Sequence, residues 1–450
     1  MTRFLFNRSS QERQPNFSKL VNRRVRDMGD SGLGDLLKYA GDPKIKSLSA
    51  GSPDSKLFPI KEIIEAFTKV IGPEGYGPNL LQYGKARGFG PLLDVLPEFL
   101  SRSNRQVRTK SENIAITAGS QEALSILGEL FLNPKGGTKI AVESPTYIGA
   151  VGAWKKFNPN YIEIPTDEFG IIPAELEKTF KKHKDIKFLY TIPTFQNPTG
   201  KTIPLEKRKE IARILQKYGK LAVEDDPYSE LRYEGEDVPS IQSLAPKNVI
   251  HLFTFSKTVA PGGRVGGIVF PEQISTKEIN NIMTPYNNIK TGQELFTSYV
   301  FQAIVSELIK DKTIDKHILK IRESYKLKRD VMAQTIQENF PDIFDVSVPS
   351  GGMFIWLRLK DEHKKLAKKL DIAKINQYIA KTYTSDLGVG KHFYAKRRIL
   401  IEKLLHPKYK TNEVSMRLNF TNRTEEEIRL AIQSIGEVLK QILAGSLVLE

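Results

Sequence analysis

Short apolar runs alternate with helical patterns between about residue 112 and residue 270. One helical pattern, Leu205–Tyr218, places Ile211, Ile214 and Leu215 on a single face. Such alternation predicts a mostly parallel sheet covered by helices, a three-layer α/β unit. The predicted strands are Asn113–Thr117, Lys139–Val142, Tyr161–Ile164, Lys187–Ile192, Lys220–Val223, Val249–Phe253 and Gly266–Phe270.

The last two strands depart from the parallel pattern. Too few residues separate Val249–Phe253 from Gly266–Phe270 to form a helical crossover. We therefore expect these two strands to run antiparallel, so that the sheet contains one antiparallel strand.

The pattern changes in the C-terminal part of the chain. Residues from about 290 to 340 read as one long helix, unbroken or broken, and the strands and helices beyond it are grouped. Grouping indicates a second, smaller α+β domain. We expect a large domain at residues 61–325 and the small domain at 326–450, with residues 1–60 forming an N-terminal arm and part of the small domain. The predicted elements are strands Phe344–Val348, Gly352–Leu359, Arg398–Ile401 and Val414–Asn419 and helices Ala373–Thr382 and Glu425–Leu443.

Composition removes several classes of chemistry. The 450 residues include no cysteine, which excludes disulfides, thiolate metal sites and a cysteine nucleophile. None of the six histidines pairs with another at the spacing of a metal motif, so no metal is expected. No run approaches ~18 consecutive apolar residues, so no membrane span is expected. Lack of cysteine fits a reducing compartment, and we expect a cytoplasmic location.

The net charge of +16 raises the question of nucleic-acid binding. Lysines, however, stand in mixed runs such as Lys178–Lys187 and Asp361–Asp371, where acidic residues are interleaved. Such runs are typical of solvated helix faces, and no nucleic-acid partner is expected. The arm at residues 1–16 carries arginine and serine and few acids, which leaves a docking arm and a targeting segment both open.

Candidate chemistry follows the ends of the predicted strands, where open α/β sheets bind ligands. Gly119 and Ser120 begin a helix after the first strand, and free N–H groups at a helix start can hold a phosphate. Asn197 lies in a Pro/Gly-rich loop. Three consecutive carboxylates at 224–226 end an apolar strand, where buried charge needs cationic partners. Lys257 follows another strand, and burial would make its amine nucleophilic.

The spacing of three of these positions predicts that they belong to one site. Asn197, Asp225 and Lys257 follow successive strands and are 28 and 32 residues apart, which suits one strand–helix unit each. We expect all three to converge on one crevice. An amine, a carboxylate and an amide near a phosphate cradle are what pyridoxal phosphate (PLP) requires, because its ring nitrogen must stay protonated to withdraw electrons.

Five segments, in order along the chain, resemble those of the class I/II aminotransferases, especially the branch of 2-aminoadipate, kynurenine and aromatic aminotransferases. The resemblance extends from about residue 17 to about residue 443 and implies the PLP fold of type I. The segments are Ala118–Leu124 (AGSQEAL), Glu143–Tyr147 (ESPTY), Gln196–Gly200 (QNPTG), Glu224–Tyr228 (EDDPY) and Phe255–Gly266 (FSKTVAPGGRVG).

The resemblance implies a role for each matching residue. Lys257 would form the Schiff base and move the proton between the substrate Cα and the cofactor. Asp225 would pair with the ring nitrogen, and Tyr147 would stack on the ring. Asn197 and Tyr228 would bind the ring 3-oxygen. The implied phosphate contacts are Gly119, Ser120, Gln121, Thr254, Ser256 and Arg264, joined by Tyr83 from a neighbouring subunit, which implies a homodimer with shared sites.

Substrate contacts are implied as well. Arg417 matches the arginine that binds the substrate α-carboxylate, which a planar guanidinium grips in two places. Asn197 and Gly51 would also approach the substrate. Two departures are visible. Gly34 stands where aminoadipate-preferring members tend to carry an arginine, and the pair Gly262-Gly263 replaces a glycine and a larger apolar residue.

The predicted reaction is transamination from an aromatic, 2-aminoadipate or bulky aliphatic amino acid to a 2-oxo acid, with 2-oxoglutarate as the expected acceptor. A C–S lyase or another type I PLP enzyme would use the same cofactor residues. A PLP-binding regulator is disfavoured, because it needs a winged helix-turn-helix of roughly 60–80 residues before the resemblance begins. A non-catalytic protein would be expected to lack Lys257 or Asp225.

Overall fold

The computed structural model describes residues 16–22, 26, 33–39, 42, 44–272, 276–395 and 414–449. Its large sheet consists of β2 (Ile114–Thr117), β3 (Lys139–Ser144), β4 (Asn160–Asp167), β5 (Gly170–Ile171), β6 (Ile186–Thr191), β7 (Leu221–Asp226), β8 (Val249–Thr254) and β9 (Gly266–Val269). The strand order is β2-β9-β8-β7-β6-β3-β4-β5. β3, β4, β6, β7 and β8 pair in parallel, and β9 is antiparallel to β8, as predicted. β9 is also antiparallel to β2, a pairing that the pattern did not predict. The short edge strand β5 is also antiparallel, which the pattern did not predict.

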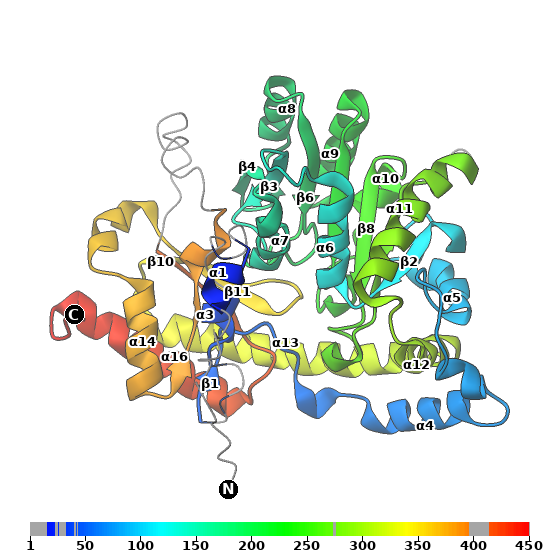
Figure 1. The fold of residues 1–450 in the computed structure, drawn as a ribbon. Coiled ribbons are helices and arrows are strands. Elements are labelled where there is room, and N and C mark those ends of the chain that lie inside the picture. The colour runs from blue at the N-terminus through cyan, green and yellow to red at the C-terminus, as the bar shows by residue number, and fades with distance from the viewer. Residues whose placement is uncertain are drawn as a thin grey trace, which may run out of the picture.

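Helices cover both faces of this sheet (Figure 1). Alternate strand residues point to opposite faces. Ala222 and Val249 pack with helices α8 to α10, whereas Val223 and Ile250 belong to the cluster that includes α6, α7 and α11. A third cluster joins α4, α5 and α12 to β2 and β9. The helices are α4 (Ile60–Ile71), α5 (Gly90–Leu100), α6 (Ser120–Phe131), α7 (Ile148–Trp154), α8 (Pro173–Lys182), α9 (Leu205–Tyr218), α10 (Ile241–Leu244), α11 (Thr276–Glu294) and α12 (Tyr299–Lys310). The predicted three-layer α/β architecture is confirmed.

The helical pattern predicted over 290–340 is broken in the structure. It contains the end of α11, all of α12 and α13 (Thr313–Asn339). Leu295 and Lys312, with φ of 65° and 60°, stand in left-handed conformation at the two breaks. A helix cannot continue through that conformation, so the chain turns there.

The smaller sheet has the order β10-β11-β14-β13 and is antiparallel throughout. α13 and α16 pack on each other beside it, and α13 runs from beneath the large sheet to this unit (Figure 1). The predicted boundary near residue 325 falls inside α13, and the domain limits stay predictions. The predicted strand Arg398–Ile401 lies outside the described residues. The elements here are β10 (Phe344–Ser347), β11 (Phe354–Leu359), α14 (Ile372–Thr382), β12 (Ser385–Asp386), β13 (Gly388–Val389), β14 (Ser415–Asn419) and α16 (Glu425–Ala444).

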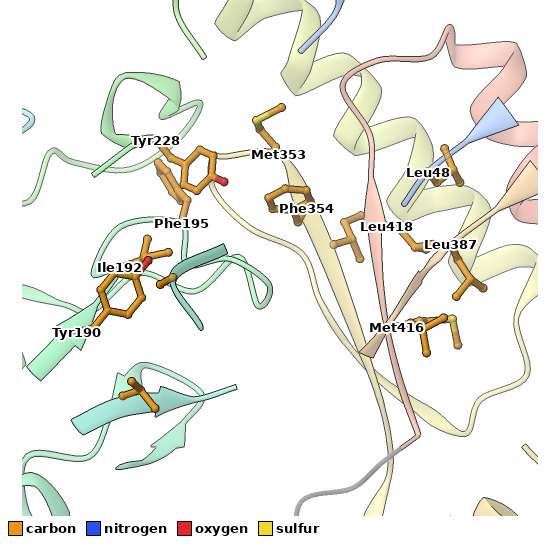
Figure 2. Packing of buried hydrophobic residues seen from close by; sticks show 14 of the residues in the cluster. Leu48, Tyr190, Ile192, Phe195, Tyr228, Met353, Phe354, Leu387, Met416 and Leu418 are labelled. Atoms are coloured by element: carbon orange, nitrogen blue, oxygen red, sulfur yellow. The ribbon is translucent and has the colours of Figure 1, made fainter. Parts of the chain in front are cut away.

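The N-terminal part of the chain packs on the other units. Its elements are α1 (Phe17–Leu20), α3 (Leu33–Leu37) and β1 (Lys46–Ser47), and β1 pairs in parallel with β12. The main hydrophobic cluster crosses between the two sheets, where Tyr228 and Phe195 lie beside Met353 and Phe354 (Figure 2). The edge of the large sheet at which β6 and β7 end is therefore held against the small sheet.

The described residues contain neither a candidate membrane span nor a candidate metal cluster. No described helix is long and apolar enough to cross a bilayer. No group of three or more histidine, aspartate or glutamate side chains in this part of the chain could hold a metal ion.

Candidate active site

The three consecutive carboxylates at the end of β7 have three different environments. Glu224 accepts hydrogen bonds from the backbone N–H groups of Ile241 and Gln242, both at 2.9 Å, at the start of α10. Asp226 accepts from Arg105 Nε at 2.7 Å. Burial alone would raise the pKa of Asp226, but the nearby cations offset it and hold the pKa below its usual value. Two of the carboxylates are thus satisfied by the protein.

Asp225 is the exception. Its Oδ2 accepts a hydrogen bond from the Tyr190 hydroxyl at 2.9 Å, while its buried Oδ1 has no hydrogen-bond partner among the described residues. Burial raises the pKa of Asp225 to about 7. A buried carboxylate oxygen with no partner and no adjacent guanidinium fits the protonated ring nitrogen of a cofactor.

Lys257 follows β8, and its side chain is partly buried. Its Nζ donates to the carbonyl oxygen of Gly51 at 2.7 Å. Burial first, and then the charges of Arg417 and Arg264, lower the pKa of Lys257 to about 8. The amine is therefore nearer to its neutral, nucleophilic form at physiological pH than an exposed lysine would be.

Arg417 comes from β14 of the small sheet and reaches the large one. Its guanidinium lies 4.2 Å from the ring centroid of Phe354 and 4.7 Å from that of Phe393. Nη1 donates to Asn197 Oδ1 at 2.8 Å, and Nη2 donates to the carbonyl of Ser49. Nε is buried without a partner among the described residues, and burial lowers the pKa of Arg417 to about 10. A buried cation that packs against two aromatic rings, with no carboxylate in salt-bridge contact among the described residues, suits a carboxylate ligand.

Asn197 connects these groups. Its Nδ2 donates to the Tyr228 hydroxyl at 3.3 Å, on the side opposite its contact with Arg417. Tyr147 stands at the start of α7, where burial, and then the charge of Asp225, raise its pKa to about 12. The structure thus brings Asn197, Asp225 and Lys257 into one cluster with Tyr228, Tyr147 and Arg417, and the roles of these residues stay predictions.

The predicted phosphate contacts gather at the start of α6. Gly119 has a φ of 76°, a conformation that favours glycine, and a Cβ added there would lie 2.8 Å from Arg264 Nη2 and displace the guanidinium. Arg264 donates to the carbonyl of Ala118. The buried Ser120 hydroxyl has no partner among the described residues, and Thr254 Oγ1 donates to Ser256 Oγ at 2.9 Å. N–H groups, hydroxyls and a guanidinium meet here, which is a donor set for a phosphate.

Two predicted cofactor residues are placed less directly. The Gln121 amide donates to the carbonyl of Gly149 at 3.0 Å, so its side chain is already engaged. Tyr83 is 77% exposed, and its ring packs on Phe296 at 6.1 Å. No hydrogen bond found in the structure joins Tyr83 to the other predicted site residues of the described chain.

Comparison with known proteins decides the family. The family model for aminotransferase class I and II matches residues 43–435. The chain belongs to this family. It is 35% identical over 432 residues to the aromatic-amino-acid aminotransferase 1 of Thermococcus litoralis, covering 94% of this chain and 95% of that protein. It is 32% identical over 418 residues to the 2-aminoadipate transaminase of Thermus thermophilus, covering 92% and 95%. The structure of Pyrococcus horikoshii kynurenine aminotransferase superposes with a TM-score of 0.81 at 34% identity, covering 95% and 98%.

This aminotransferase is therefore a transaminase of fold type I that uses pyridoxal phosphate. The donor set described above fits that group. Lys257 would hold its aldehyde carbon, Asp225 its ring nitrogen and the start of α6 its phosphate. When bound, the ring withdraws electrons from the substrate Cα.

Some residues of the aminotransferase site were missed from sequence. Tyr190 stands inside a predicted strand, where nothing marks it as a site residue. Its contact with Asp225 can be inferred only when the register of β6 and β7 is known. Phe354 and Phe393 contact Arg417, but Phe354 stands in an apolar run that reads as a strand and Phe393 follows Lys391 and His392 with no pattern that marks it. Ser49 contributes only a backbone carbonyl, for which no side-chain pattern exists.

Proposed function

We propose that this aminotransferase takes the amino group of amino acids with aromatic or bulky apolar side chains and passes it to a 2-oxo acid, with 2-oxoglutarate as acceptor. A small apolar cluster beside Arg417 carries the proposal. It consists of Leu36, Ile148, Trp356 and Phe393, against which Tyr147 packs.

The position of this cluster relates it to a substrate side chain. Phe393 contacts both the Arg417 guanidinium and Trp356, whose ring centroid lies 6.0 Å from that of Phe393 at an interplanar angle of 90°. Leu36 is fixed in place because the Ser49 hydroxyl donates to its carbonyl at 2.8 Å, and Ser49 also contacts Arg417. A substrate whose carboxylate pairs with Arg417 would therefore have apolar surface close to its side chain, which favours an apolar group over an acidic one.

The same proposal assigns the individual roles. Lys257 would bind the cofactor and move the substrate proton, Asp225 would keep the ring nitrogen protonated, and Arg417, with Asn197 and Gly51 nearby, would orient the substrate. The exposed Gly34 in α3 supports this substrate choice, because an arginine that could pair with an acidic side chain is absent at that position.

We further propose a homodimer with shared sites. The helix α4 buries Ala66 and Val70 but exposes Ile60 (62%), Ile64 (59%) and Phe67 (40%) on its other face. An exposed apolar stripe on a helix is typical of a protein interface. The exposed Tyr83 would then be available to the cofactor phosphate of a second subunit. A cytoplasmic location is part of the proposal and rests on the absence of cysteine.

The visible absorption spectrum tests the function. We expect the purified protein to be yellow with bound PLP, to bleach with phenylalanine or leucine far faster than with 2-aminoadipate, and to regain its colour with 2-oxoglutarate. Leu36→Ala should lower kcat/KM for phenylalanine about tenfold by enlarging the pocket. Leu37→Ala is the matched control, since Leu37 is its neighbour and is 50% exposed. Faster bleaching by 2-aminoadipate would refute the substrate class, and bleaching that 2-oxoglutarate cannot reverse would refute the acceptor.

A further inference from the structure

Lys290 of α11 is a fully buried lysine that belongs to none of the roles assigned above. Its Nζ donates to Glu122 Oε2 at 2.5 Å, to Thr297 Oγ1 at 2.7 Å and to the Glu294 carboxylate. Removing an ammonium group from water is costly unless several partners compensate it. Here two carboxylates and a hydroxyl do so.

One of these partners, Glu122, contacts the chain next to the phosphate cradle, the donor set formed by Gly119, Ser120, Thr254, Ser256 and Arg264. Glu122 Oε2 also accepts a hydrogen bond from the backbone N–H of Ala118 at 2.6 Å. Ala118 immediately precedes Gly119 and Ser120, and its carbonyl accepts from Arg264. α11 and α6 lie side by side, and one turn before Lys290 the Tyr286 hydroxyl donates to the carbonyl of Ile116 at 2.7 Å. Helix α11 therefore holds the chain on the approach to the cradle at two points.

The other two partners, Glu294 and Thr297, lie beside the turn that packs on the loop carrying Tyr83, which is called the Tyr83 loop below. Glu294 and Thr297 flank the turn between α11 and α12, and Phe296 in this turn packs on Tyr83. Phe296 also packs on Tyr299 at 5.4 Å, and the Tyr299 hydroxyl accepts from the backbone N–H of Lys85 at 2.6 Å. The single ammonium group thus stands between the cradle and the Tyr83 loop.

We propose that Lys290 is a positioning residue for the cofactor phosphate: through Glu122 it fixes the turn at Ala118, and through Thr297 it sets the Tyr83 loop relative to that turn. The inference rests on the proposed cofactor roles of these segments. Lys290 contacts neither substrate nor the reacting atoms, so its loss should weaken PLP binding without changing turnover once the cofactor is bound.

The test measures the dissociation constant of PLP with the full-length protein, by quenching of tryptophan fluorescence, together with the melting temperature of the cofactor-free form. Lys290→Met should raise the dissociation constant roughly five- to tenfold, the effect of one lost hydrogen bond, and leave kcat at saturating PLP within about twofold. Glu294→Gln is the matched control, because it keeps the contact from Lys290 to Glu122 and Ala118. It should leave the dissociation constant nearly unchanged.

A double-mutant cycle separates positioning from general destabilisation. Glu122→Leu removes the acceptor of the Ala118 N–H while Lys290 keeps Glu294 as its counter-charge, so this variant should fold and also bind PLP more weakly. In that background Lys290→Met should weaken binding by a smaller factor than in the unmodified protein, because only its contact with Thr297 is left to lose. A lower melting temperature with an unchanged dissociation constant, or an equal effect of Lys290→Met in both backgrounds, would overturn the proposal. Failure of the unmodified protein to bind PLP would instead refute the proposed function.

Discussion

At the scale of single residues, Asp225 should make the stability of the cofactor-free protein depend on pH. Burial raises its pKa from 3.8 to about 7, so its contribution is fully present below about pH 4 and is lost as pH rises through 7. Asp225→Asn removes the ionisation and should stabilise the protein at pH 8 by a few kcal/mol, at most about 4, with little effect near pH 4. Urea unfolding of both proteins at the two pH values measures the difference.

The neighbouring carboxylate provides the control. The pKa of Asp226 is held below its usual value despite burial, so Asp226 contributes stability at neutral pH that is lost in acid. Asp226→Asn should therefore destabilise the protein at pH 8, the opposite sign. Glu143, whose pKa burial also raises to about 7, titrates in all three proteins and cancels in the comparison. Equal pH dependence in Asp225→Asn and the unmodified protein would contradict the expectation.

Lys257 should control how fast the cofactor-free protein takes up PLP. Only the neutral amine attacks an aldehyde, and the pKa of Lys257 is lowered to about 8. The rate of attachment should rise about tenfold per pH unit up to about pH 8 and then level off. Arg417→Leu removes one of the charges that lower this pKa and should move the plateau to higher pH. Stopped-flow absorbance of the yellow band measures both curves, and an unmoved plateau in the variant would contradict this electrostatic account.

Most of these site residues could be predicted because each stands directly after an apolar strand, where a charged or amide side chain is conspicuous. Asp225 and Lys257 are of this kind. Tyr190, Phe354 and Phe393 could not be predicted, because their function lies in which side chain they contact across a sheet or between sheets. Those contacts depend on strand register and on packing between sheets, which the local pattern of apolar and polar residues does not determine.

At the scale of elements, the turn before Arg264 gives a matched pair of substitutions. A Cβ at Gly263 would lie 2.0 Å from the Phe301 ring of α12, whereas nothing lies within 4 Å of a Cβ at Gly262. The departure Gly262-Gly263 noted in the sequence is therefore explained at position 263 by the close approach of α12. Nothing in the structure explains the glycine at 262.

Gly263→Ala should destabilise the protein by roughly 1–3 kcal/mol and loosen the turn that presents Arg264. Gly262→Ala should be neutral or stabilise by up to about 1 kcal/mol, because it restricts only the unfolded chain. The midpoints of urea unfolding of the two variants, compared with that of the unmodified protein, test this difference, and their affinity for PLP is a second readout. Equal midpoints would mean that Phe301 moves aside at no cost.

The larger elements of the fold were accessible from sequence because helices and central strands carry a full period of apolar residues. β1, β5, β12 and β13 have two residues each, too few to show a period. β5 and β13 pair with the longer strands β4 and β14, and β1 and β12 pair with each other, so all four depend on long-range contacts. The sequence left open whether the helix over residues 290–340 is broken, but it did not place a break at Leu295. The apolar pattern continues past it, and the turn is stabilised by the packing of Phe296 on the distant Tyr83 and by hydrogen bonds from the buried Lys290 of α11 to Glu294 and Thr297.

At the scale of the whole molecule, the site forms only where two sheets meet. Arg417 of β14 and Asn197 after β6 are 2.8 Å apart at Nη1 and Oδ1, although 220 residues separate them in sequence. Gly51, from the N-terminal part, supplies the acceptor for Lys257. The residue patterns predicted the large and the small unit separately. That Arg417 of the small sheet lies against the large sheet depends on packing between distant parts of the chain, and only the resemblance to a family anticipated it.

The shared sites of the proposed homodimer can be tested by mixing two inactive proteins. Lys257→Ala lacks the cofactor lysine, and Tyr83→Ala lacks the tyrosine that would serve the neighbouring subunit. Tyr83 is 77% exposed, so its substitution should leave the fold intact. If Tyr83 acts across the interface, a mixed dimer contains one site with both defects and one site with none. Random reassortment should then restore about a quarter of the unmodified activity at limiting PLP.

Each protein alone should stay near its own background under the same conditions, which sets the baseline for the mixture. If Tyr83 served its own subunit, every site in the mixed dimer would carry one defect, and mixing would restore nothing. If the protein were a monomer, mixing would also restore nothing, and its mass in solution would be 50.9 kDa rather than twice that value. Measuring the mass in parallel, with Ile64→Glu to disrupt the apolar face of α4, separates these cases. A monomeric Ile64→Glu protein that no longer complements would identify α4 as part of the interface through which Tyr83 reaches its neighbour.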